Sequence, residues 1–296
     1  MYDLIIVGGG PGALGAAIYA ARAKLNTILI AKEIGGYLTQ TDKIENYLGF
    51  KNPSGLELKN AFEDHVKSYN LKIIEDQEVS KIYETNGLIN CELEDETIIT
   101  CKYAIVATGS KRKKLGVKGE KEFLHKGVTY CAVCDGPVFQ DQNVAVIGGS
   151  YSGTKSALYL SNIANKVYLL EIDKLKGEAL LIDQIRNNPK IEIIENAKTL
   201  EIYGSDYVEG LKYEKNNNIE KIELQGISIE IGLIPSSDLV DVKKNADGKI
   251  IVDDYMMTSN KKIFAVGDVN DKNYEQIIIA AAQGCIAALK INEVLK

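Results

Sequence analysis

The chain has 296 residues, of which 45% are hydrophobic, and its formal net charge is -6 at pH 7. This length is sufficient for two domains, and the hydrophobic content is sufficient to fill two cores. The net negative charge gives no support to nucleic-acid binding, because proteins that bind nucleic acids present basic surfaces to the phosphates.

The N-terminal segment predicts a dinucleotide-binding βαβ unit. An apolar strand, Leu4 to Val7, runs into glycines and then into an alanine-rich helix. Gly8 permits a tight bend, Gly10 lets the backbone approach a pyrophosphate, and the helix amides point at the phosphate charge. A second strand, Thr27 to Ala31, leads to Glu33, where an acid that binds ribose is expected. A glycine turn that binds nothing is the alternative, but strand, turn, helix and second strand together favour dinucleotide binding.

The middle of the chain predicts a change of domain. A helix from Phe62 is followed by strands around 72–74, 79–83 and 98–107. We interpret the basic run Lys111 to Lys114 as a linker and the segment 234–240 as a returning linker. The first domain is therefore discontinuous, and we set the domain boundaries at 1–113, 114–237 and 238–296.

Cys131 and Cys134 are the one pair among five cysteines with the two-residue spacing of a redox dithiol. In a reducing compartment this spacing suggests a catalytic disulfide. Structural zinc would need a second pair of ligands, which the sequence does not offer, so we expect no metal. Asp135 follows the pair and is a candidate proton shuttle, the alternative being a solvated turn residue. The remaining cysteines lie in apolar or strand-like contexts that favour buried thiols: Cys91, Cys101 and Cys285.

A second strand and glycine turn, Asn143 to Gly153, opens the inserted domain. Its central position is Ser150, whose side chain stands where a pyrophosphate must sit. The next strand, Lys166 to Leu170, is followed by Glu171. An acid at this place is what NAD uses to bind its ribose 2′-hydroxyl, so NAD binding stays open as an alternative.

Near the C-terminus, a strand ends in Gly267-Asp268 and is followed by Gln276 and an alanine-rich helix. By itself this is a strand-end turn before a helix. Apolar runs such as 277–282 are too short to span a bilayer, so we expect no membrane contact. The first core strand begins close to Met1 and leaves no room for a signal peptide, from which we expect a cytoplasmic location.

Together these motifs resemble the low-molecular-weight flavin thioredoxin reductases over nearly the whole chain. The resemblance implies an α/β fold with two Rossmann-like dinucleotide-binding domains of the three-layer ββα type, the second inserted into the first. It also implies FAD as cofactor, thioredoxin as partner and a homodimer. The segments that carry the resemblance, besides the motifs above, are 35–41, 45–47, 107–110, 115–123 and 127–130.

The resemblance also assigns roles to residues. Cys134 would face the flavin, Cys131 would attack thioredoxin, and Asp135 would carry the proton. Two departures from the family pattern are Tyr37, where glutamine is usual, and Glu275, where arginine is usual. The residues expected to bind FAD are Gly8, Gly10, Pro11, Glu33, Gly36, Tyr37, Asn46, Thr108, Gly109, Gly267, Asp268 and Gln276.

The electron donor is the point at which this chain departs most from the NADPH-dependent reductases. Those enzymes resemble it but have glycine at the place of Ser150, and cationic side chains in the segment that here reads Glu171, Ile172, Asp173 and, later, Gly177. Arginines in that segment would bind the 2′-phosphate of NADPH. Their loss favours the branch of the family that takes electrons from reduced ferredoxin. The alternatives are an NAD(P)H-fed disulfide reductase and a non-enzymatic flavin-binding module.

The run Lys111 to Lys114 is a candidate docking site for ferredoxin. Ferredoxins are small acidic proteins, and a chain with net charge -6 needs a local positive surface to attract one. An ordinary solvated linker is the alternative.

Overall fold

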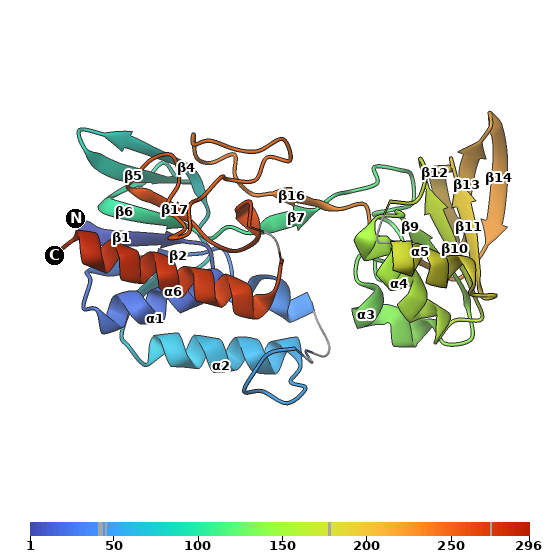
Figure 1. The fold of residues 1–296 in the computed structure, drawn as a ribbon, viewed down its shortest axis with the longest axis horizontal. Coiled ribbons are helices and arrows are strands. Elements are labelled where there is room, and N and C mark those ends of the chain that lie inside the picture. Colours follow the sequence, from blue (N-terminus) through green and yellow to red (C-terminus); the bar gives the residue numbers. More distant parts are fainter. Residues whose placement is uncertain (41–43, 45, 177–178, 273) are drawn as a thin grey trace. The chain divides into compact units, whose positions relative to one another are not determined.

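The computed structural model describes all residues of the chain except 41–43, 45, 177–178 and 273 (Figure 1). It divides into two compact units, one formed by Met1–Lys111 with Ile234–Lys296 and the other by Arg112–Leu233. The expected boundaries stand after residues 113 and 237, and the units divide after Lys111 and Leu233. The chain passes between the units through β7 (Ser110–Arg112) and β16 (Leu233–Pro235), which pair with each other.

The first unit is built on a mixed sheet with the strand order β3-β2-β1-β6-β5-β4, in which β17 also pairs with β6. The strands β1, β2, β3, β6 and β17 pair in parallel, whereas β5 pairs antiparallel with β6 and β4 pairs antiparallel with β5. Leu4, Ile5 and Ile6 are fully buried, as expected for a strand covered on both faces. The strands are β1 (Tyr2–Val7), β2 (Thr27–Ile30), β3 (Lys72–Ile74), β4 (Val79–Thr85), β5 (Leu88–Leu93), β6 (Ile98–Val106) and β17 (Ile263–Ala265).

Two helices of this unit, α1 (Pro11–Arg22) and α6 (Ile277–Val294), pack closely against each other (Figure 1). A Cβ added to Gly284 would lie 2.0 Å from the carbonyl oxygen of Gly12, and one added to Gly15 would lie 2.4 Å from that of Ala281. Glycines at the crossing therefore permit the close approach of the two backbones. The third helix, α2 (Gly55–Lys67), begins with a capping box between Ser54 and Glu57.

Helix α6 is longer than the apolar run expected from the sequence. Its 18 residues have a mean hydropathy of 1.5, which by length and composition is sufficient to cross a membrane. In the fold, however, α6 packs along α1 and buries Ala280, Gly284, Ala287 and Ile291 in the first unit. The helix therefore belongs to the packed structure of this unit.

The second unit has a parallel sheet with the strand order β11-β10-β9-β15-β8 and a separate antiparallel sheet with the order β12-β13-β14. The parallel strands are β8 (Val128–Thr129), β9 (Asn143–Ile147), β10 (Lys166–Glu171), β11 (Ile191–Glu195) and β15 (Gly226–Ile229). The antiparallel strands are β12 (Lys198–Gly204), β13 (Val208–Lys215) and β14 (Asn218–Glu223). The helices are α3 (Ala132–Asp135), α4 (Tyr151–Ser161) and α5 (Ala179–Arg186).

The described part of the chain also contains the short 3₁₀ helices η1 (Gly36–Gln40), η2 (Gly136–Phe139) and η3 (Gly267–Val269). Each unit has its own hydrophobic core, with the first centred on β1, β2 and β6 and the second on β9, β10 and β15. The expected α/β fold with two Rossmann-like domains, the second inserted into the first, is confirmed.

Candidate functional site

The glycine turn of the first unit lies at the N-terminus of α1. Gly8 has a φ of +119°, and a Cβ there would lie 2.2 Å from the carbonyl oxygen of Ala107. A Cβ on Gly10 would meet no atom within 4 Å, and one on Gly36 would lie 3.4 Å from the Cα of Gly10. Pro11 is the first residue of the helix. The structure therefore brings these predicted residues together around helix amides that can bind an anion.

Glu33 and Tyr37 flank the same turn. The carbonyl oxygen of Glu33 would lie 2.0 Å from a Cβ added to Gly9, so the end of β2 is packed against the glycines. The Glu33 side chain is exposed, while Tyr37 lies half-buried in η1. Both residues are thus placed on the segment that borders the turn.

Other predicted residues come together from distant parts of the sequence. The Nδ2 of Asn46 donates to the Oε1 of Gln276 at 2.8 Å, although the two residues are 230 positions apart. The Thr108 hydroxyl donates to the carbonyl oxygen of Ser236 at 2.6 Å, and the amide of Ser236 donates to the carbonyl oxygen of Gly109 at 2.9 Å. These bonds join the two sequence segments that form the first unit.

Two buried polar residues that sequence reasoning missed support the turn at Gly267. The Gly267 amide donates to the Oε1 of Gln283 at 2.7 Å. The Nδ2 of Asn270 donates to the same oxygen at 2.8 Å and to the carbonyl oxygen of Ala265 at 3.0 Å. A buried amide must find partners, so an Asn and a Gln near a predicted turn are a usable sequence signal.

Asp268, one of the residues expected to bind FAD, is a strongly perturbed acid. Burial, assisted by the negative charge of Glu275, raises the pKa of Asp268 to about 6, and the charge of Lys249 opposes this rise. The Nζ of Lys249 lies 2.6 Å from the Oε1 of Glu275. Glu275, which departs from the family pattern, is therefore neutralised in part by a lysine from another segment.

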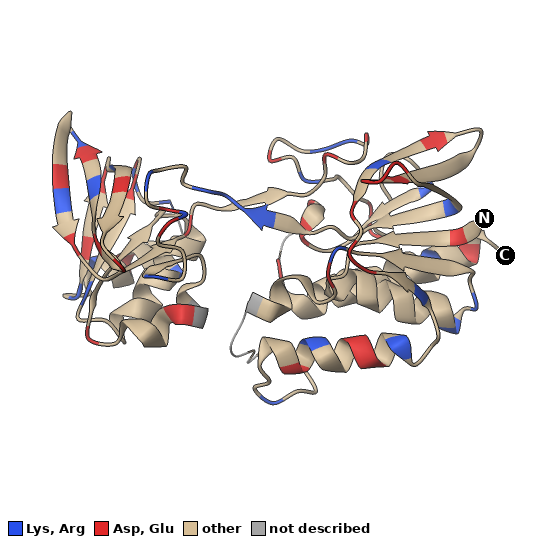
Figure 2. Cartoon of the chain, turned by 180° about the vertical axis from the view of Figure 1, so that it is seen from behind, with Lys and Arg blue, Asp and Glu red and all other residues tan. Residues whose placement is uncertain are grey.

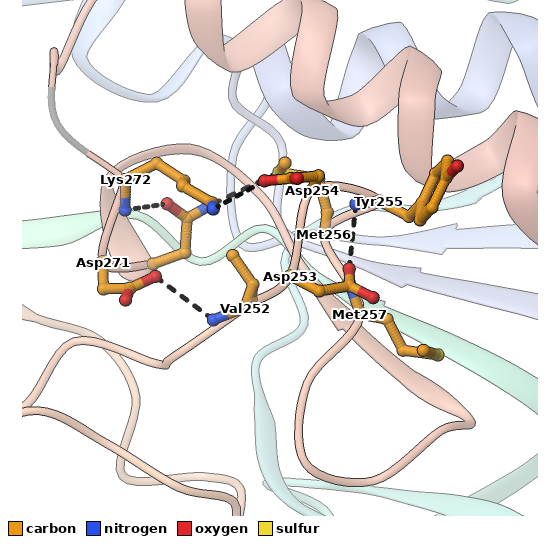
Figure 3. Close-up of polar contacts among 9 residues, drawn as sticks. Val252, Asp253, Asp254, Tyr255, Met256, Met257, Asp271 and Lys272 are labelled. Carbon is orange, nitrogen blue, oxygen red and sulfur yellow. Dashed lines mark hydrogen bonds and ion pairs between the residues drawn. The ribbon is translucent and has the colours of Figure 1, made fainter.

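A loop from 250 to 257 braces the segment that contains Asp268. The amide of Ile250 donates to the carbonyl oxygen of Val269 at 2.9 Å. Further along, the amide of Val252 donates to the carboxylate of Asp271 at 3.1 Å (Figure 3). The carboxylate of Asp253 accepts bonds from the amides of residues 255 and 257, which closes the loop on itself (Figure 3).

The dithiol segment of the second unit joins β8 to α3. The hydroxyl of Thr129 accepts a hydrogen bond from the amide of Cys131 at 3.0 Å and donates one to the carboxylate of Asp135. The amide of Asp135 donates to the carbonyl oxygen of Cys131 at 3.1 Å. Cys131 and Asp135 therefore lie at the two ends of one helical turn. The side chain of Cys134 lies outside the described part of the chain.

Tyr130, the residue before Cys131, is held from three directions. Its hydroxyl donates to Glu120 at 2.6 Å, and Glu120 also accepts two backbone amides from 115–116 at 2.7 Å each. The Arg112 guanidinium donates to the carbonyl oxygen of Tyr130, and the Nζ of Lys114 lies 4.1 Å from its ring centroid. Two members of the basic run thus contact the residue next to the dithiol.

In the second glycine turn, a backbone amide donates a hydrogen bond to a carboxylate. Gly148 has a φ of +113°, and the Glu171 side chain accepts the amide of Gly149 through one oxygen and that of Asp173, at 3.2 Å, through the other. Ser150 is the N-cap of α4, and its exposed side chain makes no capping bond within the described residues. Gly177 lies outside the described residues. The carboxylate at the end of β10 therefore occupies a place beside the turn.

A buried acid that sequence reasoning missed, Glu230, lies under the N-terminus of α4. Its carboxylate accepts hydrogen bonds from Ser152 at 2.8 Å, Ser156 at 2.9 Å and Ser228 at 3.2 Å. Three hydroxyl donors and the adjoining helix N-terminus stabilise a buried carboxylate without a cation. Glu230 therefore ties β15 to α4.

The cysteines outside the pair are free thiols. Cys91 and Cys101 are fully buried on the neighbouring strands β5 and β6, and hydrogen bonding with Cys101, together with burial, raises the pKa of Cys91 well above its ordinary value. Cys285 is partly exposed. Among the described residues, no group of three or more His, Cys, Asp or Glu side chains could hold a metal ion.

Comparison with known proteins identifies the family. Residues 2–284 match the pyridine nucleotide-disulphide oxidoreductases. The chain belongs to this family. It is 39% identical over 293 residues to the NADH dehydrogenase of Bacillus subtilis (strain 168) and to the F component of the alkyl hydroperoxide reductase of Staphylococcus aureus (strain NCTC 8325 / PS 47). The alignments cover 97% of this chain but 57% and 58% of those proteins.

Solved structures of thioredoxin reductases are similar over the whole chain. That of Lactococcus lactis, in its FR conformation, has a TM-score of 0.81 and 32% identity, and covers 99% of this chain and 98% of that chain. That of T. acidophilum has a TM-score of 0.79 and 37% identity with the same coverage. A ferredoxin-flavin thioredoxin reductase from Clostridium acetobutylicum has a TM-score of 0.55 and 32% identity, again with this coverage. The chain has the two-domain fold of these reductases.

FAD is the cofactor of this family member, and the residues of the first unit fit it. The absence of a side chain at Gly10 leaves the N-terminus of α1 open to a pyrophosphate, Glu33 follows β2, and Asp268 is a partly buried carboxylate beside a strand end. The individual FAD contacts remain predictions.

Proposed function

We propose that this chain reduces the disulfide of thioredoxin or of a thioredoxin-like domain through Cys131 and Cys134. The observation that carries this proposal is the arrangement at the start of α3, where one hydroxyl joins the backbone of Cys131 to the carboxylate of Asp135. Similarity to thioredoxin reductases supports the choice of substrate. The free thiols among the described residues, Cys91, Cys101 and Cys285, lack this arrangement.

The proposed chemistry is thiol–disulfide exchange. When bound, FAD would supply the two electrons that, with two protons, convert the Cys131–Cys134 disulfide to a dithiol. The Cys131 thiolate then attacks one sulfur of the partner, forming a mixed disulfide and releasing a partner thiolate. Cys134 attacks the Cys131 sulfur, which restores the internal disulfide and releases the second partner thiolate. Each released thiolate takes up one proton, and Asp135 holds and moves the proton exchanged at Cys131.

We propose NADH as the source of electrons, in place of the reduced ferredoxin that the sequence favoured. The carboxylate of Glu171 on the amide of Gly149 stands at the strand end where NAD-binding domains place the acid for the ribose 2′-hydroxyl. The 2′-phosphate of NADPH would meet this negative charge, and the segment 171–177 contains no arginine to bind it. A relative bearing the name NADH dehydrogenase supports the same choice.

Reduced ferredoxin is the second candidate, and Ser150 favours it. The Ser150 side chain stands at the central position of the turn, where a pyrophosphate requires close approach to the backbone. The basic run supports ferredoxin docking less well than its sequence suggests, because Arg112 and Lys114 contact Tyr130. The cations along and after β7 are visible in Figure 2. The Nζ of Lys111 lies 4.0 Å from the Oε1 of Glu78. Among the contacts of the described residues, the side chain of Lys113 is therefore the one in this run without a hydrogen bond, ion pair or ring contact.

Anaerobic reduction of the purified flavoprotein by NADH, NADPH and reduced ferredoxin, each alone, separates the donors. We expect NADH to bleach the visible flavin absorbance rapidly and NADPH to do so at least about 10-fold more slowly, since a charge-assisted contact contributes about 1.5–3 kcal/mol. In Glu171→Gln the preference for NADH over NADPH should fall. Asp173 is an exposed acid on the same segment, and Asp173→Asn should preserve the preference. Bleaching by ferredoxin alone would overturn the NADH proposal in favour of the second candidate.

We also propose that the protein is a cytoplasmic homodimer. The outer face of α6 exposes apolar side chains, Ile278, Ile279, Ile286 and Leu289, between 36% and 48% of their maximum. An apolar patch of this kind is typical of a protein or membrane contact. Sedimentation of the wild type and of Leu289→Lys tests the dimer, since a monomeric wild type contradicts it. Cell fractionation tests the location, and recovery in the membrane fraction would point to α6 as a membrane contact.

A further inference from the structure

We infer that Thr129 is a positioning residue for proton transfer at the dithiol, an inference that rests on the proposed disulfide exchange. Thr129 is the last residue of β8 and precedes Cys131 by two positions. It is 3% exposed, and its strand neighbour in the parallel pairing with β15 is the equally buried Ser228. The sheet therefore fixes the Thr129 hydroxyl beneath the start of α3.

The Thr129 hydroxyl has three polar contacts with the reacting residues, of which the one to the carbonyl oxygen of Cys131, at 3.4 Å, is long and the other two are short. It accepts the Cys131 amide at 3.0 Å, and it donates its one proton to the carboxylate of Asp135. The second bond directs the carboxylate back along the helical turn toward its N-terminal end, where Cys131 lies. Within the described part of the chain, Thr129 is the side chain that forms a hydrogen bond with this carboxylate. Removal of the hydroxyl would free Asp135 without altering its chemical identity.

The position of Asp135 matters because the exchange moves a proton. The Cys131 thiol attacks a disulfide RS–SR, the S–S bond breaks, and the products are the mixed disulfide of Cys131 and the thiol RSH. Asp135 takes the proton of Cys131 and delivers it to the departing sulfur. This help is needed most when the departing thiolate is strongly basic, because a weakly basic thiolate leaves readily without a proton.

Two disulfides of different leaving ability test the role of Thr129. The flavoprotein is reduced chemically, freed of reductant and mixed with hydroxyethyl disulfide, whose thiolate is strongly basic, or with dithiobis(nitrobenzoate), whose thiolate is weakly basic. In Thr129→Val we expect the first reaction to slow by roughly 10-fold or more and the second to change by less than about twofold. Thr129→Ser, which retains the hydroxyl, should restore the first rate. Thr154→Val, at a fully buried threonine of α4 whose hydroxyl donates to Tyr151, is the matched control.

A double-variant cycle separates positioning from a general loss of structure. If Thr129 acts through Asp135, then Thr129→Val combined with Asp135→Asn is no slower than Asp135→Asn alone. The inference is overturned if the rate losses of Thr129→Val and Asp135→Asn multiply in the double variant. It is also overturned if Thr129→Val slows the reactions with both disulfides equally, or if it reacts at the wild-type rate. A wild-type dithiol that reduces neither disulfide would instead overturn the proposed function, and this inference with it. If Thr129→Val folds poorly, Thr129→Ser is measured in its place. A rate of Thr129→Ser with hydroxyethyl disulfide as low as that of Asp135→Asn would then contradict the inference.

Discussion

At the scale of single residues, three acids of this chain lie in different environments. Asp268 is buried beside Glu275, whereas Glu171 accepts two backbone amides and Glu230 accepts three serine hydroxyls. Hydrogen-bond donors stabilise a carboxylate, while burial without them favours its protonated form. Of these three acids, Asp268 is therefore the one whose ionisation opposes folding, which is consistent with its predicted contact to the hydroxyl groups of FAD.

Stability of the FAD-free protein should decrease as the pH rises through the titration of Asp268. Its pKa is raised from 3.8 to about 6, so between these values the folded state binds more protons than the unfolded state. The sign of the linkage then requires the free energy of unfolding to fall with rising pH, by up to about 3 kcal/mol above pH 6. Urea unfolding at pH 4.5 and pH 7 measures this change.

Asp268→Asn should remove that part of the pH dependence. Other carboxylates titrate in the same interval, so the comparison is between variants. Asp254→Asn is the control, because the Asp254 side chain is 97% exposed. An equal change with pH in the two variants would show that burial of Asp268 does not oppose folding.

At the scale of elements, the contact between α1 and α6 depends on the absence of side chains. Gly284 lies against Gly12, and both helices place small residues at the crossing. Alanine is a better helix former than glycine by roughly 1 kcal/mol, so propensity by itself favours replacement of Gly284. Steric overlap acts in the opposite direction, because the added Cβ would lie 2.0 Å from a carbonyl oxygen.

Gly284→Ala should therefore destabilise the first unit by about 1–3 kcal/mol despite the gain in helix propensity. Ala282→Ser, on the exposed face of the same helix, should change stability by less than about 0.5 kcal/mol. Urea unfolding of both variants measures the two effects. A more stable Gly284→Ala protein would mean that the helices move apart without cost.

At the scale of the whole molecule, the residues predicted to bind FAD and those proposed to carry out disulfide exchange belong to different units. The glycine turn around Gly8 and the acid Asp268 belong to the first unit, whereas Cys131 and Asp135 belong to the second. Each unit has its own core. Changes to the dithiol should thus leave the cofactor site of the first unit intact.

Cys131→Ser and Cys134→Ser should each abolish turnover with thioredoxin while FAD remains bound. Exchange needs one sulfur to form the mixed disulfide and another to resolve it, so either loss stops the cycle. Turnover assays and the flavin content of the purified variants provide the two measurements. Cys285→Ser is the matched control and should retain both properties. Loss of FAD from either dithiol variant would contradict the separation of roles.

The sequence by itself determined the elements whose signals are local. Glycines after an apolar strand predicted the turns that precede α1 and α4, whereas the redox role of Cys131 and Cys134 stays a prediction. The sequence was also sufficient to expect an inserted domain, because the strand and turn pattern begins anew at Asn143. The sequence did not determine the length of α6. After residue 282 the helix has both buried and exposed apolar residues, and they are recognised as parts of one helix only when α1 is packed against it.

Tertiary structure decided the contacts between residues that are far apart in the chain. Only folding brings Asn46 to Gln276, and Lys249 to Glu275 beside Asp268. It also turned a basic run that reads as free charge into two contacts with Tyr130, and it placed the Glu171 carboxylate on the second glycine turn. Such contacts are set by strand register and helix packing, whereas the residues of a turn are neighbours in the sequence. For this reason the motifs could be predicted from the sequence and their distant partners could not.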